Sequence, residues 1–91
     1  MAIIELSQSH QLNPDDARKK VEEMAERFAI QYDLKTSWTS NILTFEGNGV
    51  SGTIKAKPEE IQVLIELSMF VSLLKGKIEA GIREELEKKF G

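Results

Sequence analysis

Apolar and polar residues alternate with a period of two in five short stretches of the chain, which predicts five β-strands. These stretches are residues 2–7, 34–39, 42–46, 50–56 and 60–67. The last four are separated by short segments rich in turn-forming residues, at positions 40–41, 47–49 and 57–59. Because strands joined by such short turns run antiparallel, the pattern predicts an antiparallel meander that follows a separate first strand.

The segment after the first strand carries the signals of a helix start. Asn13 is placed to cap free backbone N–H groups, Pro14 suits the first helical position, and Asp15 and Asp16 favour the positive end of the helix dipole. The helix is therefore expected to begin at Pro14. Its core-facing stripe consists of apolar residues at spacings of three and four: Ala17, Val21, Met24, Ala25, Phe28 and Tyr32.

The C-terminal third predicts a second helix, which begins between Ser68 and Lys75 and continues to Phe90, with Ser68 as the best capping candidate. Its apolar residues recur at intervals of four: Phe70, Leu74, Ile78, Ile82, Leu86 and Phe90. Each such step advances 400°, so the first and last of them would lie about 200° apart on a straight helix. Either Gly76 kinks the segment or starts the helix proper, or one end presents apolar surface to a partner.

Acidic residues precede basic ones by four positions on both predicted helices, which favours ion pairs along each helix surface. The expected pairs are Asp15/Lys19, Asp16/Lys20, Glu23/Arg27, Glu79/Arg83, Glu84/Lys88 and Glu85/Lys89.

The element order β-α-β-β-β-β-α predicts an α+β fold, in which an antiparallel sheet of about five strands carries two helices on one face. Residues 1–91 are expected to form a single domain. The uncovered face of the sheet should carry the Ser, Thr and Lys residues of the alternating strands, with Leu43 or Leu64 as apolar exceptions.

Charge and composition exclude several classes of function. A net charge of −3 argues against nucleic acid as a partner, since nucleic-acid modules carry a clustered basic excess. The absence of cysteine excludes disulfides and thiolate metal ligands. No signal peptide is visible, and the longest nearly uncharged stretch, 61–74, is too short to span a bilayer. We therefore expect a cytoplasmic protein with no transmembrane segment.

Residues with catalytic chemistry are sparse. His10 is the only histidine, and a lone histidine in a connecting loop is more often a surface or capping residue than a catalytic one. The Gly47–Gly49 cluster links two strands and no Lys-Ser/Thr follows it, so a hairpin turn explains it better than a phosphate-binding loop. The sequence predicts no metal site, no cofactor and no enzymatic activity.

Two groups of apolar residues are candidate binding sites. The first comprises Met69, Phe70, Leu73 and Leu74 beside the basic Lys75-Gly76-Lys77, and suits either an amphiphilic or granule surface or a buried strand-to-helix junction. The second comprises Trp38 and Phe45, which either line a ligand pocket or pack in the core.

Short motifs along nearly the whole chain, from about Ser9 to Phe90, resemble the small polyhydroxyalkanoic acid system proteins. These motifs are His10-Gln11-Leu12, Asp16-Ala17-Arg18, Trp38, the stretch 45–52 with Gly49-Val50-Ser51-Gly52-Thr53-Ile54, and Lys75-Gly76-Lys77-Ile78-Glu79 with the Ile82/Leu86 helix. The resemblance implies a bacterial cytoplasmic protein connected with polyhydroxyalkanoate metabolism or granules, and it carries over no catalytic residues. The chain departs from the family at Leu73-Leu74-Lys75, where a proline is expected in many relatives.

The leading hypothesis is a non-enzymatic accessory protein that binds the polyester granule surface or a granule-associated protein through residues 69–74. The alternative is a carrier of a small hydrophobic or hydroxyacyl ligand beside Trp38 and Phe45. A third hypothesis, an enzyme acting on polyester monomers through His10, lacks a second catalytic group. A homodimer is compatible with each of the three.

Overall fold

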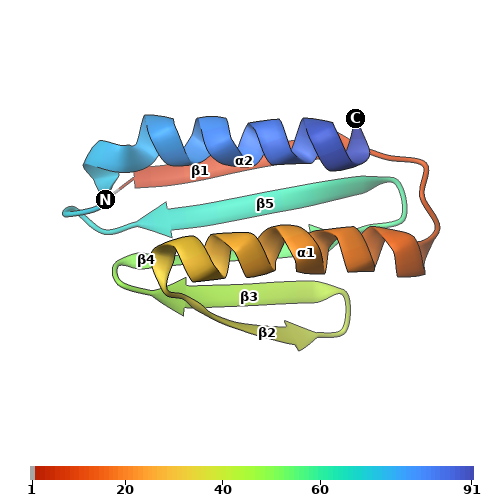
Figure 1. The fold of residues 1–91 in the computed structure, drawn as a ribbon, viewed down its shortest axis with the longest axis horizontal. Coiled ribbons are helices and arrows are strands. Elements are labelled where there is room, and N and C mark those ends of the chain that lie inside the picture. Colours follow the sequence, from red (N-terminus) through yellow and green to blue (C-terminus); the bar gives the residue numbers. More distant parts are fainter. Residues whose placement is uncertain (1) are drawn as a thin grey trace.

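The computed structural model describes residues 2–91 and contains a five-stranded antiparallel sheet with two helices (Figure 1). The elements are β1 (Ala2–Ser9), α1 (Pro14–Tyr32), β2 (Lys35–Thr39), β3 (Ile42–Gly47), β4 (Val50–Ala56), β5 (Glu60–Leu67), a 3₁₀ turn (Ser72–Leu74) and α2 (Lys75–Phe90). The strand order across the sheet is β1-β5-β4-β3-β2. The predicted α+β class and the predicted element order are both confirmed.

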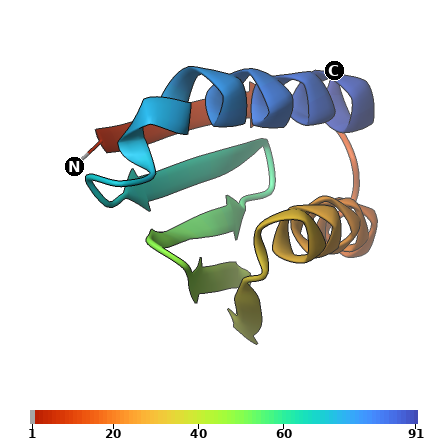
Figure 2. The same ribbon diagram turned by 60° about the vertical axis from the view of Figure 1, so that its left-hand side comes forward.

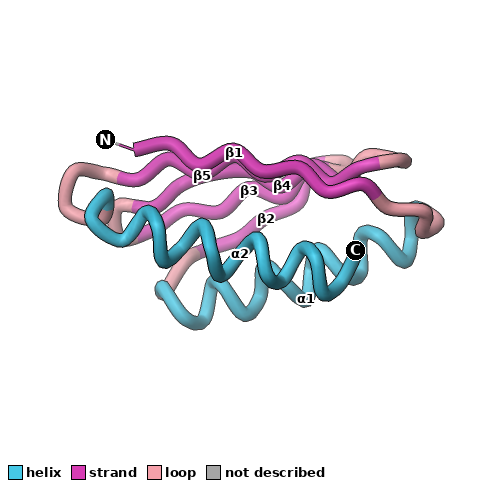
Figure 3. Tube along the Cα trace, turned by 90° about the horizontal axis from the view of Figure 1, so that it is seen from above, coloured by secondary structure: helices cyan, strands magenta, loops and turns pink. Residues whose placement is uncertain are grey.

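Both helices lie on the same face of the sheet, which gives the molecule two layers (Figure 3). Helix α2 packs over β1, whereas α1 packs over β2, β3 and β4 (Figure 2). The opposite face of the sheet is left uncovered (Figure 3).

Strand register decides which side chains reach the core. The row Leu6, Val63, Ile54, Leu43 and Trp38 crosses the sheet through directly paired residues. Since paired residues share a face, the whole row points toward the helices, and Leu43 is buried. The sequence allowed Leu43 or Leu64 as an apolar residue on the uncovered face. Leu43 does not lie there, whereas Leu64 does and is partly exposed.

Three strand boundaries differ from those expected, and the smallest difference is that β3 ends at Gly47 instead of Glu46. Strand β1 continues to Ser9, because its polar end pairs with β5 as far as Glu60 although it buries no apolar residue. Strand β2 begins at Lys35, because the N–H of Leu34 donates to the carbonyl oxygen of Ala29 and completes the end of α1.

Helix α1 begins as predicted. The Asn13 Oδ1 accepts a hydrogen bond from the Asp16 N–H at 2.9 Å, and Pro14 occupies the first turn. The expected stripe is also confirmed, since its first four residues are buried while Phe28 and Tyr32 pack half-buried against the core.

Helix α2 begins at Lys75, within the expected range, but Ser68 does not cap it. Instead, the Ser68 carbonyl oxygen accepts hydrogen bonds from the N–H groups of Val71 and Ser72 in the preceding turn. Phe70 and Leu74 consequently lie outside the helix, and only the last four residues of the apolar series are buried: Ile78, Ile82, Leu86 and Phe90. The angular drift across the longer series is thus resolved by a late helix start.

Of the ion pairs expected within each helix, only Glu79–Arg83 forms among residues 2–91, at 3.2 Å. Arg27 instead pairs with Glu85 at 3.1 Å, and Lys89 pairs with Glu23 at 3.2 Å. These two bridges join α1 to α2, because the helices run antiparallel and bring opposite charges across the space between them. Exposed pairs of this kind contribute at most about 1 kcal/mol each.

His10 has a structural role at the opposite end of the molecule from the β5–α2 connection. Its Nε2 lies 2.8 Å from the Lys57 carbonyl oxygen, and its Nδ1 accepts from the Leu12 N–H at 3.1 Å. These partners assign the ring proton to Nε2. The ring also packs against Phe90 at 5.7 Å between centroids, so this buried side chain ties together the ends of β1, β5 and α2.

Replacing His10 by Ala should lower the free energy of unfolding by about 2–3 kcal/mol, since it removes two hydrogen bonds and an aromatic contact from a buried position. Urea unfolding followed by circular dichroism measures the change. The exposed neighbour Gln11 provides the control, because Gln11→Ala should change stability by no more than about 0.5 kcal/mol. Equal effects of the two variants would contradict the structural role.

Gly52 and Gly81 should respond oppositely to substitution by Ala. A Cβ at Gly52 would overlap the Leu64 carbonyl oxygen and lie 2.8 Å from Cζ of Phe45, whereas a Cβ at Gly81 meets nothing within 4 Å. Gly52→Ala should therefore destabilise the protein by about 3 kcal/mol. Gly81→Ala should stabilise it by about 0.5–1 kcal/mol through helix propensity. Thermal or urea unfolding of both variants checks the prediction, and a well-tolerated Gly52→Ala would show that β4 and Phe45 are less tightly packed.

Candidate functional site

The connection between β5 and α2 exposes four large apolar side chains, which we name the junction surface: Met69, Phe70, Leu73 and Leu74. Their exposed fractions are 77%, 94%, 91% and 44%. The connection lies at one end of the long axis of the molecule (Figure 1). The structure thus places these residues at the surface and not in a buried strand-to-helix junction.

Hydrogen bonds within the turn hold these side chains outward. The N–H of Ser72 donates to the Ser68 carbonyl oxygen at 2.9 Å, and the Ser72 hydroxyl donates to the Met69 carbonyl oxygen at 2.8 Å. The Leu74 N–H donates to the Val71 carbonyl oxygen at 2.9 Å. Val71 packs half-buried against the core beneath the turn. Much of the polar backbone of the segment is therefore satisfied internally, while its apolar side chains remain free.

The Gly47–Gly49 turn supports the junction from the side. The Ser68 N–H donates to the Gly49 carbonyl oxygen at 2.8 Å. Gly49 has a φ of 83°, and a Cβ there would overlap the Ser68 hydroxyl and lie 2.9 Å from the nearest Val71 methyl carbon. The predicted hairpin turn is confirmed, and its contact with the junction is an additional role that sequence spacing did not indicate.

Positive charge borders the junction surface on the side of α2. Lys75 and Lys77 are exposed in the first turn of this helix, which contains no acidic residue. Apolar side chains flanked by lysine are typical of surfaces that contact an amphiphilic or apolar phase.

The structure does not bring Trp38 and Phe45 together in a pocket. Phe45 is 1% exposed, and its ring packs edge-on against Phe28 at 5.4 Å between centroids, so it is a core residue. Trp38 lies half-buried on the edge strand β2, and the Arg18 guanidinium carbon lies 4.2 Å from the centroid of its ring. Neither residue adjoins the junction surface, which lies near the ends of β5 and β1.

A groove of about 460 Å³ separates the two helices. Its lining includes Met24, Phe28 and Ile82, and the Arg27–Glu85 pair lies beside it. One oxygen of Glu85 is buried without a hydrogen-bond partner in the described chain. The sequence does not predict this groove, because its apolar lining comes from the stripes of two helices whose relative position the sequence pattern does not give.

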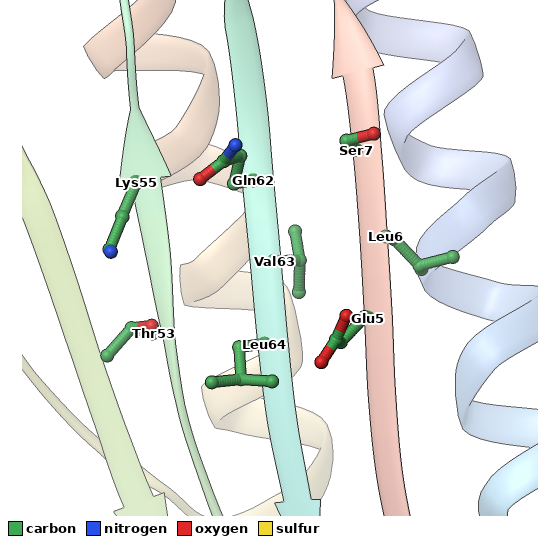
Figure 4. A pocket seen from close by; sticks show the side chains of 8 residues that line it. All are labelled: Glu5, Leu6, Ser7, Thr53, Lys55, Gln62, Val63 and Leu64. Carbon is green, nitrogen blue, oxygen red and sulfur yellow. The ribbon is translucent and has the colours of Figure 1, made fainter.

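A second depression, of about 420 Å³, lies on the uncovered face of the sheet (Figure 4). In Figure 4 the side chain of Leu64 lies between Thr53 on β4 and Glu5 on β1. The hydroxyl, amide and charged groups around it match the polar face that the strand alternation predicted.

Both ring nitrogens of His10 are engaged with backbone groups. Among residues 2–91, no three His, Asp or Glu side chains are grouped so that they could hold a metal ion. Neither helix in this range has the length and apolar character that a membrane span requires.

Comparison with known proteins relates most of the chain to a family. The model of the family described as "Putative polyhydroxyalkanoic acid system protein" matches residues 4–90. No curated protein and no solved structure matches the chain. Because the family match covers both helices and nearly all of the sheet, the chain belongs to the polyhydroxyalkanoic acid system protein family.

Proposed function

We propose that this chain is a non-enzymatic accessory protein of bacterial polyhydroxyalkanoate metabolism, which binds the cytoplasmic polyester granule, or a protein on it, through the junction surface. The family supplies the link to polyhydroxyalkanoate systems. The observation that carries the proposal is the exposure of Phe70 and Leu73, which are both more than 90% accessible in a turn with several internal backbone hydrogen bonds.

The apolar contribution of this surface suits reversible binding. Burying one large apolar side chain contributes about 1.5–3 kcal/mol, so four partly to fully exposed ones offer on the order of 5–10 kcal/mol. Association costs roughly 4–15 kcal/mol in lost freedom of motion. The two ranges overlap, so the junction surface alone supports a binding equilibrium and not permanent attachment.

A second candidate function, binding of a small hydrophobic or hydroxyacyl ligand, is favoured by the groove between the helices and not by Trp38 and Phe45. The volume of this groove, about 460 Å³, lies within the range of roughly 300–1,000 Å³ that is typical of small-molecule sites. Hydroxyacyl compounds of increasing chain length should then shift the NMR signals of the Met24 methyl group, and Gly81→Leu should remove the shift by filling the groove. Unchanged spectra across the series would exclude this candidate.

The leading proposal is tested by co-sedimentation of the purified protein with native granules and with protein-stripped polyester particles, at low and high salt. Salt-resistant binding to both particles would support direct apolar contact, and binding to native granules alone would identify a protein partner. Binding to neither would overturn the proposal.

Changing Phe70 and Leu73 together to Ser should reduce granule binding at least tenfold. The free energy of unfolding should change by less than about 1 kcal/mol, because both side chains are exposed and leave no cavity. Ile30→Ser is the matched control, since Ile30 is also 77% exposed but lies on α1. Equal loss of binding in the control would point to general hydrophobicity, and unfolding of the double variant would show that the turn contributes to the core.

A further inference from the structure

The sheet has two edge strands, and a different helix packs over each of them. Strand β1 forms one edge, and α2 packs along it (Figures 1 and 2). Strand β2 forms the other edge and pairs only with β3 among the described strands. It has no proline, and its five residues leave one row of backbone groups without a neighbouring strand. Such an edge is a template for pairing with another extended segment.

Backbone geometry sets what an added strand would meet. Bonded and non-bonded pairs alternate along an antiparallel ladder, so alternate residues of β2 direct their N–H and C=O groups away from β3. The side chains of Thr36 and Trp38 lie on the helix-covered face, as their pairing with Phe45 and Leu43 requires. Every second side chain of an added strand would therefore point toward the flank of α1.

A groove of about 540 Å³ lies where those side chains would enter, between α1 and β2. Ala25, Ala29, Leu34 and Trp38 contribute apolar surface to it. Ile30, which is 77% exposed, also lines this groove. The groove and the unpaired strand edge thus adjoin each other, as they do in domains that bind peptides by strand addition.

The charges around the groove indicate the chemistry of its partner. Glu22, Glu26 and Asp33 line it, and none of them forms a salt bridge within residues 2–91. The Arg18 guanidinium stacks on Trp38 and donates to the Ser40 carbonyl oxygen at 2.9 Å, near the far end of β2. The side of the groove formed by α1 is therefore acidic and suits a basic side chain.

We propose that β2 and the flank of α1 bind an extended segment of another protein as a sixth strand. The inward-facing positions of this segment alternate between apolar residues, which contact Trp38 and Ile30, and Lys or Arg, which meets Glu22 and Glu26. The proposal is independent of the junction surface and of granule binding.

A second copy of the chain is a poorer occupant of the same edge. Pairing of two β2 strands about a two-fold axis would place the acidic flank of one α1 beside the acidic flank of the other. Like charges brought together in this way oppose association, whereas a basic segment relieves the acidic groove.

The test uses the full chain and the peptide Val-Thr-Lys-Thr-Val-Thr-Lys, blocked at both ends. Trp38 is the only tryptophan, so its fluorescence reports on the proposed site directly. The expected result is a saturable change in fluorescence, with amide NMR shifts concentrated at residues 35–39. Replacing the lysines of the peptide by glutamate should weaken binding at least tenfold. The inward-facing valines and lysines of the peptide are the residues whose N–H groups would face β2, because they lie opposite Thr36 and Trp38. A peptide with both valines replaced by proline keeps the charge but loses two of these N–H groups, and it should not bind.

A charge-reversed protein, Glu22→Lys with Glu26→Lys, should prefer the glutamate peptide, and both substituted positions are exposed on α1, so the fold should persist. Equal binding of the proline peptide, an unchanged preference in the reversed protein, or no saturable signal would each overturn the proposal. A concentration-dependent dimer that alters Trp38 fluorescence without peptide would also overturn it, in favour of a second copy.

Discussion

The register of the five strands is the constraint on which the rest of the structure depends. One face of the sheet must be apolar for two amphipathic helices to cover it, and a slip of one residue in any strand would turn its apolar side chains toward water. The row from Leu6 to Trp38 stays in phase across every strand. Gly52 permits this alignment where the Phe45 ring approaches the backbone of β4, since no side chain would fit between them. The core is therefore continuous from β1 to β2.

This arrangement also explains why apolar residues are left over at the junction. Helix α2 must cross from the end of β5 to lie over β1, and the chain makes that crossing in residues 68–74. Val71 reaches the core beneath the turn, but its neighbours extend beyond the edge of the covered face. Backbone hydrogen bonds within the turn and the contact with Gly49 then hold those neighbours outward. Their exposure follows from defined local structure and not from a lack of order in the segment.

The fold could be predicted from sequence because its signals are local. Strand alternation, the Asn13-Pro14 helix start and the turn glycines each act within a few residues, and they identified the elements and the covered face. Two ion pairs were not predicted, because they depend on contacts between the two helices. Glu23, Arg27, Glu85 and Lys89 satisfy the spacing rule within each helix, yet they pair between helices because the antiparallel arrangement offers closer partners.

The candidate site was less predictable for the same reason. The fourfold spacing of apolar residues continues from Ile78 back to Phe70, so spacing alone could not tell which of them lie in the helix. The angular drift of the series left two explanations open, a kink or helix start at Gly76 or an end that presents apolar surface. The helix starts at Lys75, next to Gly76, and the residues before it form the exposed junction surface. Phe45 and Trp38 both lie at inward-facing positions of alternating strands, so the sequence pattern does not distinguish them. Trp38 is half-buried because β2 forms an edge of the sheet, whereas Phe45 lies on an inner strand and is fully buried.

The junction surface and the edge at β2 differ in the kind of contact that their backbone permits. At the junction surface several backbone groups of the turn bond to one another, which lowers the cost of facing an apolar phase. At β2 the backbone groups are unpaired on one side and require a partner that supplies hydrogen bonds. A polyester or lipid surface therefore suits the first feature and not the second, whereas an extended protein segment suits the second. Because the first lies between β5 and α2 and the second lies on β2 and α1, occupation of one leaves the other accessible.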